Sequence, residues 1–95
     1  MRPFLPLLAV LTLAATTSQA ACFADYKAKR DNPLKLHYGV VELPDTACVS
    51  RASAADAIAR RIAPDGWQLL TVMQIFDRSG LDQRKASAGA YFLRY

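Results

Sequence analysis

The first twenty residues have the pattern of a leader that is removed after export. We expect them to take no part in the fold, so only residues 21–95 remain to form it. After the single charge in Met1–Pro3, the chain is apolar over the twelve residues Phe4–Ala15. Ser18 and Ala20 then provide the small side chains that a signal peptidase accepts, so we predict cleavage between Ala20 and Ala21. A membrane span needs about 20 apolar residues, and this run of twelve is too short to be one. We therefore expect no stable membrane span after cleavage.

A second processing site overlaps the first. Ala20-Ala21-Cys22 is similar to the site of bacterial lipoproteins, in which the cysteine carries a diacylglycerol. Gln19 stands where such sites have leucine, and Cys22 is not the first residue after the preferred cut. We therefore predict a leader over residues 1–20 and a single small domain over residues 21–95, with lipidation of Cys22 as the alternative.

The two cysteines predict a disulfide. The chain has 17 alanines, and 8 arginines against 4 lysines, which is typical of a GC-rich bacterial genome. In a bacterium, the leader predicts a periplasmic or secreted protein. In such an oxidising compartment, Cys22 and Cys48 allow only one connectivity. Removing 20 of the 95 residues leaves 75, and a domain of that size buries only about 60–65% of the surface of its unfolded chain. The bridge is therefore expected to stabilise a marginal core.

Several kinds of site are excluded by the residues that they require. His37 is the only histidine and no C-x-x-C spacing occurs, which argues against a zinc or dithiol site. The net charge of +4 is dispersed, and the one dense basic group (Lys27, Lys29 and Arg30) lacks the interleaved aromatics of a nucleic-acid footprint. No serine lies in a G-x-S-x-G elbow. We expect no catalytic residue, no cofactor, no metal and no nucleic-acid partner.

The hydrophobic periodicity divides the mature chain into six segments. In order, they are a short helical turn or irregular arm (22–33), a strand (34–43), a helix (51–63), a central strand (67–76), an exposed hairpin loop (77–89) and a final strand (90–95). In the first strand, Leu36 and Tyr38 share one face, while Lys35 and His37 share the other. The prediction is a small α+β domain of β-α-β-β order, with one helix on a three-stranded, mainly antiparallel sheet and a disulfide-stapled N-terminal arm.

The corner between the helix and the next strand carries a family resemblance. Gly66 allows the positive φ of a helix end, and Trp67 fills the gap between helix and sheet. With Leu69, these residues make residues 34–95 resemble the short β-α-β-β domains of unknown function that have a Gly-Trp-Glu-Leu corner. Gln68 stands where those domains have glutamate. The resemblance implies the fold and carries no catalytic residue.

The absence of a catalytic set favours a non-enzymatic module that binds another protein or an envelope component. A three-stranded sheet leaves a face or an edge open, which favours a partner or a homodimer through that edge or face, with contact expected over residues 77–95. One alternative is an inhibitor of an extracytoplasmic enzyme. Another is a small hydrolase that uses His37 with Lys35 and a nearby carboxylate. The aromatic side chains are expected mainly in the core, with a binding surface as the alternative; they are Tyr26, Tyr38, Trp67, Tyr91 and Tyr95.

Overall fold

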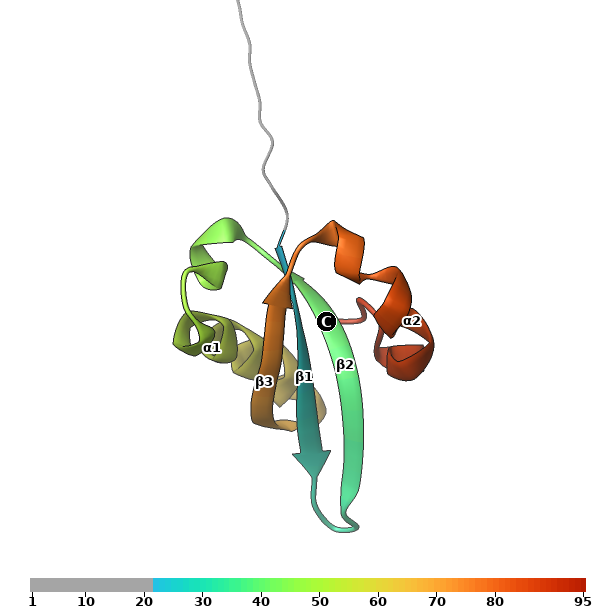
Figure 1. Cartoon of the computed structure of the whole chain (residues 1–95). Helices are drawn as coiled ribbons and strands as arrows, with labels where there is room; N and C mark the ends of the chain where they lie inside the picture. Colours follow the sequence, from blue (N-terminus) through green and yellow to red (C-terminus); the bar gives the residue numbers. More distant parts are fainter. Residues whose placement is uncertain (1–21) are drawn as a thin grey trace, which may run out of the picture.

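A computed structural model describes residues 22–95, so the predicted leader and its cut between Ala20 and Ala21 lie outside the described residues. Three strands, two α-helices and four short 3-10 turns make up this part of the chain (Figure 1). The strands are β1 (Cys22–Arg30), β2 (Lys35–Leu43) and β3 (Gln68–Phe76), and the helices are α1 (Arg51–Ile62) and α2 (Asp82–Ala88). The turns are η2 (Asp45–Cys48), η3 (Ala63–Asp65), η4 (Arg78–Gly80) and η5 (Gly89–Tyr91).

The strands form one antiparallel sheet in the order β2-β1-β3, so β1 is central. The β1–β2 hairpin pairs without interruption from Cys22 opposite Leu43 to Arg30 opposite Lys35. The pairing of β1 with β3 contains two bulges, which place extra residues on β3. The predicted class, an α+β domain with a three-stranded antiparallel sheet, is confirmed.

The two helices lie on opposite faces of the sheet (Figure 1). We call these the α1 face and the α2 face. The α1 face carries the larger cluster of buried side chains, whose main members are Ala24, Tyr26, Val41, Leu43, Ile58, Ile62, Trp67 and Val72. The α2 face carries the smaller cluster, with Phe23, Val40, Leu81 and Ala88. The domain therefore has three layers, with the sheet between the helices.

Helix α1 and the corner that follows it form where the sequence predicts them. Ser50 caps the helix, because its side chain accepts a hydrogen bond from the backbone N–H of Ser53. Gly66 adopts a left-handed conformation, with φ of 84°, and its N–H donates to the carbonyl of Ala63. The chain then turns into β3, and Trp67 is buried between helix and sheet.

The prediction of a helical turn or irregular arm over residues 22–33 is wrong, since Cys22–Arg30 is the central strand β1. Both faces of this strand are buried: Ala24 and Tyr26 lie on the α1 face, and Phe23 lies on the α2 face. From Ala24 to Lys29 the strand alternates apolar and polar residues, but its alanines and lysines also favour a helix. Residues 67–76, predicted as central, form the edge strand β3.

The C-terminal predictions also need correction. The exposed loop expected over residues 77–89 contains η4 and α2, and the strand expected over residues 90–95 is absent from the sheet. Only a single parallel bridge joins Phe92 to Val40. Gly89 and Leu93 have φ of 55° and 56°, which interrupts an extended conformation on both sides of that bridge. The order is therefore β-β-α-β-α, with two helices instead of one.

Gly39 makes room for the ring of Tyr26 on the α1 face of β2. On β1, Tyr26 pairs with Gly39, and a Cβ added to that glycine would lie 2.6 Å from the Tyr26 ring. The missing side chain lets the ring lie flat across β2. His37 and Gly39 are buried on the α1 face, while Leu36 on the opposite face, which α2 does not reach, is 65% exposed.

Candidate functional site

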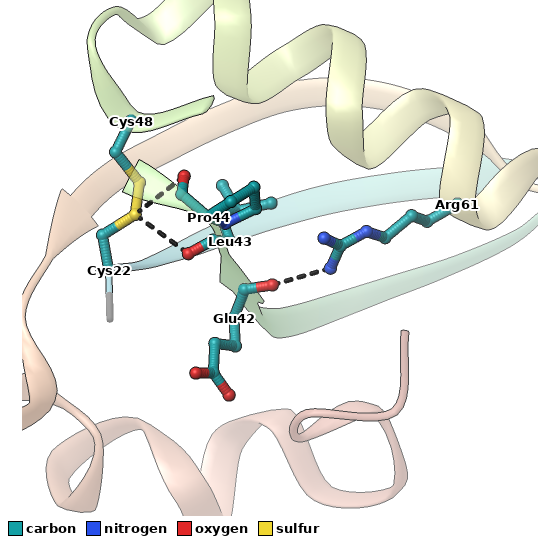
Figure 2. Close-up of a disulfide and its surroundings, with 6 residues drawn as sticks. All are labelled: Cys22, Glu42, Leu43, Pro44, Cys48 and Arg61. Atoms are coloured by element: carbon teal, nitrogen blue, oxygen red, sulfur yellow. Dashed lines mark hydrogen bonds between the residues drawn. A yellow bond between two sulfur atoms is a disulfide. The ribbon is translucent and has the colours of Figure 1, made fainter. Parts of the chain in front are cut away.

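The predicted disulfide between Cys22 and Cys48 is present and joins the start of β1 to the turn before α1 (Figure 2). The Cys22 sulfur lies 3.2 Å from the carbonyl oxygen of Leu43. This is a packing contact, because an oxidised sulfur has no proton to donate. Nearby, Arg61 of α1 donates to the carbonyl of Glu42 at 2.6 Å. This hydrogen bond occupies part of the outer edge of β2. The bridge is a structural element that fastens β1 to the α1 layer.

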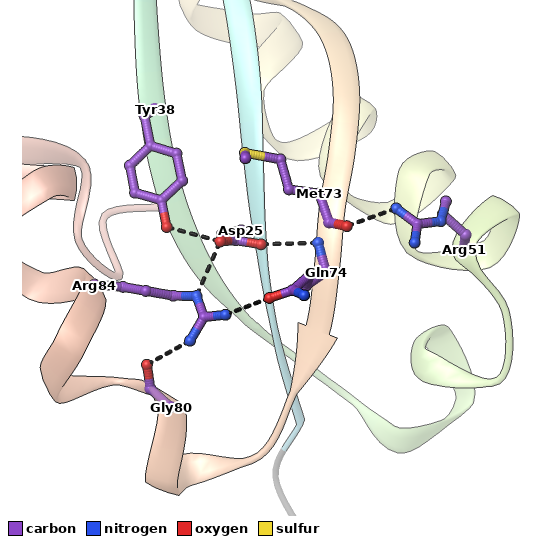
Figure 3. A network of polar contacts seen from close by, with 7 residues as sticks. All are labelled: Asp25, Tyr38, Arg51, Met73, Gln74, Gly80 and Arg84. Carbon is purple, nitrogen blue, oxygen red and sulfur yellow. Dashed lines mark hydrogen bonds and ion pairs between the residues drawn. The ribbon is translucent and has the colours of Figure 1, made fainter.

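A buried polar network attaches α2 to the sheet (Figure 3). Asp25 is only 4% exposed and accepts hydrogen bonds from Tyr38 Oη at 2.7 Å, Arg84 Nε at 2.9 Å and the backbone N–H of Gln74 at 2.8 Å. Arg84 also donates to the Gln74 side chain at 2.6 Å and to the carbonyl of Gly80 at 2.8 Å. Every hydrogen-bonding group around the carboxylate is thus satisfied.

This network is suited to holding a helix in place. Burial raises the pKa of Tyr38 to about 12, and its hydrogen bond to Asp25 contributes to the rise, so the phenol stays a donor at neutral pH. No nucleophile faces the carboxylate, whose partners are a phenol, a guanidinium and a peptide N–H. The sequence did not single out Asp25 or Arg84, because they are 59 residues apart and no local motif connects them.

A second cluster gathers the predicted aromatic residues around His37 on the α1 face. The imidazole Nε2 is 2.9 Å from Tyr26 Oη, and the ring stacks on Tyr91 with 3.7 Å between centroids. Trp67 meets it edge-on at 4.2 Å. His37 is 8% exposed, and its Nδ1 is buried without a hydrogen-bond partner among the described residues. The histidine is therefore a core residue under the C-terminal segment.

The surroundings of this cluster are cationic. The Arg30 guanidinium lies 4.2 Å from the Trp67 ring centroid, and that of Arg94 lies 5.5 Å from the Tyr91 centroid. Burial lowers the pKa of His37, and the charges of Arg30 and Arg94 lower it further. Burial also raises the pKa of Tyr26. Both side chains thus stay neutral at pH 7.

The residues of the predicted hydrolase are separated by burial. Lys35 is exposed at the start of β2, whereas His37 is enclosed by aromatic rings. Asp65, the carboxylate beside this cluster, accepts a hydrogen bond from Tyr95 Oη at 2.6 Å instead of orienting the imidazole. Among the described residues, His37 is thus buried and no carboxylate hydrogen-bonds its imidazole.

The pH dependence of stability tests the burial of His37. An unfolded histidine has a pKa of about 6.5, and the folded value is lower. Below pH ~6.5 the unfolded state therefore takes up a proton first, so stability is full above this pH and is lost as the pH falls toward the folded pKa. We expect the urea midpoint of the wild-type chain to fall between pH 7.5 and 5.5 more steeply than that of His37→Gln. Parallel slopes would contradict the burial.

The α2 face is only partly covered, and its remainder forms what we call the open sheet surface: Lys27, Leu36, Tyr38 and Leu70, with Leu34 in the adjoining β1–β2 turn. Helix α2 packs near Phe23 and Val40, so it leaves the half of the face nearest the β1–β2 turn open (Figure 1). Leu34 and Leu36 are each 65% exposed, and Leu70 is 52% exposed. A shallow cavity of about 270 Å³ lies here, with Lys27, Leu36, Tyr38 and Leu70 in its lining.

The outer edge of β2 is closed along one half only. The carbonyl of Val40 accepts from the Leu93 N–H at 2.8 Å, and that of Glu42 accepts from Arg61. Because the peptide groups of alternate strand residues point the same way, those of Leu36 and Tyr38 also face outward. Among the described residues they have no partner on that side. The open half of this edge therefore adjoins the open sheet surface.

Residues 77–95, which the sequence favours as the contact region, are mostly exposed, and a few of their side chains pack inward. Leu81 and Ala88 are buried against the α2 face, and Tyr91 covers His37. Across residues 22–95, no three His, Cys, Asp or Glu side chains gather closely enough to hold a metal ion. Neither α1 nor α2 has the length and apolar composition of a membrane span.

Comparison of the chain with protein-family models, with curated proteins and with solved structures finds no match.

Proposed function

We propose that this chain is a small exported binding module without catalytic activity, which recognises a partner protein through the open sheet surface. The observation that carries the proposal is the uneven covering of the sheet. The α1 face carries the larger buried cluster, whereas half of the α2 face exposes Leu36 and Leu70 around a cavity, beside the exposed Leu34 of the β1–β2 turn. A contiguous apolar patch with a concave centre is typical of an interaction site.

The burial of the chain's reactive groups supports a binding role over catalysis. His37 is enclosed by rings, Asp25 is saturated with hydrogen bonds, and both cysteines are oxidised. Two residues of the cavity lining have shifted pKa values: Tyr38, whose proton is committed to Asp25, and His37, whose ring packs against Trp67 and Tyr91. A hydrolase that uses His37 would need the aromatic cluster to open first.

The disulfide supports the periplasmic or secreted location. A stable bridge is expected in an oxidising compartment, which is where the predicted leader would send the chain. The same bridge occupies the sulfur of Cys22 that lipidation would require. We therefore favour export followed by cleavage between Ala20 and Ala21 over attachment to a lipid.

Site-directed photo-crosslinking tests the binding surface. A photoreactive amino acid in place of Leu36 is expected to give one discrete crosslinked species in the compartment of origin. The same residue in place of Val49 is the matched control, because Val49 is an exposed apolar side chain (77%) outside the open sheet surface. The Leu36 adduct should disappear when Leu70 is changed to serine. Equal labelling from both positions, or no adduct from Leu36, would contradict the proposal.

One feature favours the inhibitor alternative. The β1–β2 hairpin extends beyond both helices, and its turn lies between Arg30 and Lys35 (Figure 1). A projecting turn on a disulfide-bonded scaffold has a shape that can enter an enzyme cleft. In that case a photoreactive residue at Asn32 in the turn, rather than at Leu36, would give the stronger adduct.

A further inference from the structure

Two lysines of β1, Lys27 and Lys29, lie on the α2 face of the sheet, and Lys27 is the one that lines the cavity of the open sheet surface. Lys27 lies on the central strand, where it pairs with Tyr38 on β2 and with Thr71 on β3. It is exposed and lines the same cavity as Leu36 and Leu70. Lys27 therefore projects from the central strand, between the β2 and β3 residues of the patch.

No carboxylate of the described residues pairs with Lys27. The two ion pairs within residues 22–95 are Lys29 with Asp31, at 3.4 Å, and Arg84 with Asp25, at 2.9 Å. Asp25 is on the same face of the same strand, but its oxygens are taken up by the network that holds α2. A cation surrounded by apolar groups gains most from an anion that also excludes water.

The charge argues against a second copy as the occupant. A face-to-face dimer through this patch would bring two Lys27 side chains together, and like charges at an interface are destabilising. Residues 21–95 also carry 11 lysines and arginines against 8 aspartates and glutamates, a net charge of +3, so two copies repel each other. The complementary surface is one that is apolar and acidic.

We propose that the open sheet surface binds a segment of a partner protein that places an apolar side chain in the cavity and an aspartate or glutamate carboxylate on the ammonium of Lys27. This inference rests on the proposed function and specifies the chemistry of the partner. The leucines provide buried apolar area, and Lys27 selects among apolar segments by their charge. The unpaired peptide groups of Leu36 and Tyr38 offer an extended segment additional main-chain hydrogen bonds.

Selection from a displayed library of random twelve-residue peptides tests the proposal on the purified, disulfide-bonded protein. Peptides enriched on the wild type are expected to combine apolar residues with aspartate or glutamate. Selection on Lys27→Glu should invert the preference, so that lysine and arginine replace the acids. Arg60→Glu is the charge-matched control: it is an exposed arginine on α1, on the other side of the sheet, and should leave the acidic preference unchanged. All three proteins should retain the far-UV circular dichroism of the folded domain.

The outcomes separate this inference from the proposed function. Apolar peptides that need Leu36 and Leu70 but show no preference for acids, or the same preference on Lys27→Glu, would overturn the role of Lys27 and leave the binding surface standing. Peptides that bind Leu36→Asp and Leu70→Ser as well as the wild type, or a selection without enrichment, would overturn both. Loss of the acidic preference in Arg60→Glu would show that overall charge, not Lys27, attracts the peptides.

Discussion

Replacing Asp25 with alanine is expected to lower the free energy of unfolding by about 3–5 kcal/mol, because it leaves a buried guanidinium without its counterion. The Arg84 side chain is only 12% exposed, and within residues 22–95 Asp25 is the sole carboxylate paired with it. The phenol of Tyr38 and the N–H of Gln74 lose the same acceptor. Urea unfolding followed by the fluorescence of Trp67 gives the change directly.

An apolar replacement of the network provides the control. The triple variant Asp25→Val, Tyr38→Phe and Arg84→Met removes both charges and the phenol together. Buried ion pairs replaced by apolar groups of similar size are often neutral for stability, so the triple variant should unfold within about 1–2 kcal/mol of the wild type. A cost below about 1 kcal/mol for Asp25→Ala would show that the carboxylate does not hold α2 in place.

Removing the disulfide through Cys22→Ser and Cys48→Ser is expected to destabilise the domain by roughly 3–4 kcal/mol in the loop-entropy model. The bridge spans a sequence separation of 26 residues, so the unfolded chain gains much conformational freedom when it is absent. For a domain this small, such a loss is a large part of the total stability. The measurement is the urea midpoint of the double variant against that of the wild type.

Reduction gives an independent comparison for the same bridge. Dithiothreitol should lower the wild-type midpoint to nearly that of the double serine variant and leave the variant itself unchanged. If the reductant lowers neither midpoint although thiol titration shows that both sulfurs are reduced, the bridge contributes little to stability.

The sequence predicts the parts of this fold that local patterns determine. Helix α1 and strands β2 and β3 begin and end within one residue of their predicted limits, and the disulfide follows from the cysteine count. These elements have clear periodicity or distinct boundaries, such as Ser50 before α1 and Gly66 after it.

The two missed elements depend on contacts between distant residues. Strand β1 contains alanines and lysines, which also suit a helix, and becomes a strand because β2 and β3 pair with its two edges. Helix α2 has only seven residues, too few for stability from local propensity. It is fixed by the pairing of Arg84 with Asp25, which no window of sequence reveals.

The sequence predicts which kinds of feature make up the candidate site, but not where they lie. The sequence indicates a sheet with an uncovered face and a set of aromatic side chains, but not which half of which face is open. That depends on α2, which covers Val40 and stops short of Leu36. The alternation in β2 marks two faces without showing that His37, rather than Leu36, lies in the main core.

The ring of Tyr26 on β1 occupies the volume that a side chain at position 39 on β2 would fill, so the sizes of these two residues depend on each other. An alanine at position 39 would fit only if the residue opposite it were much smaller than tyrosine. A smaller residue there would in turn withdraw the hydroxyl group that meets His37. Tolerated substitutions of Tyr26, His37 and Gly39 should therefore occur together. A library that varies these three positions jointly would recover folded sequences that single-site scans miss.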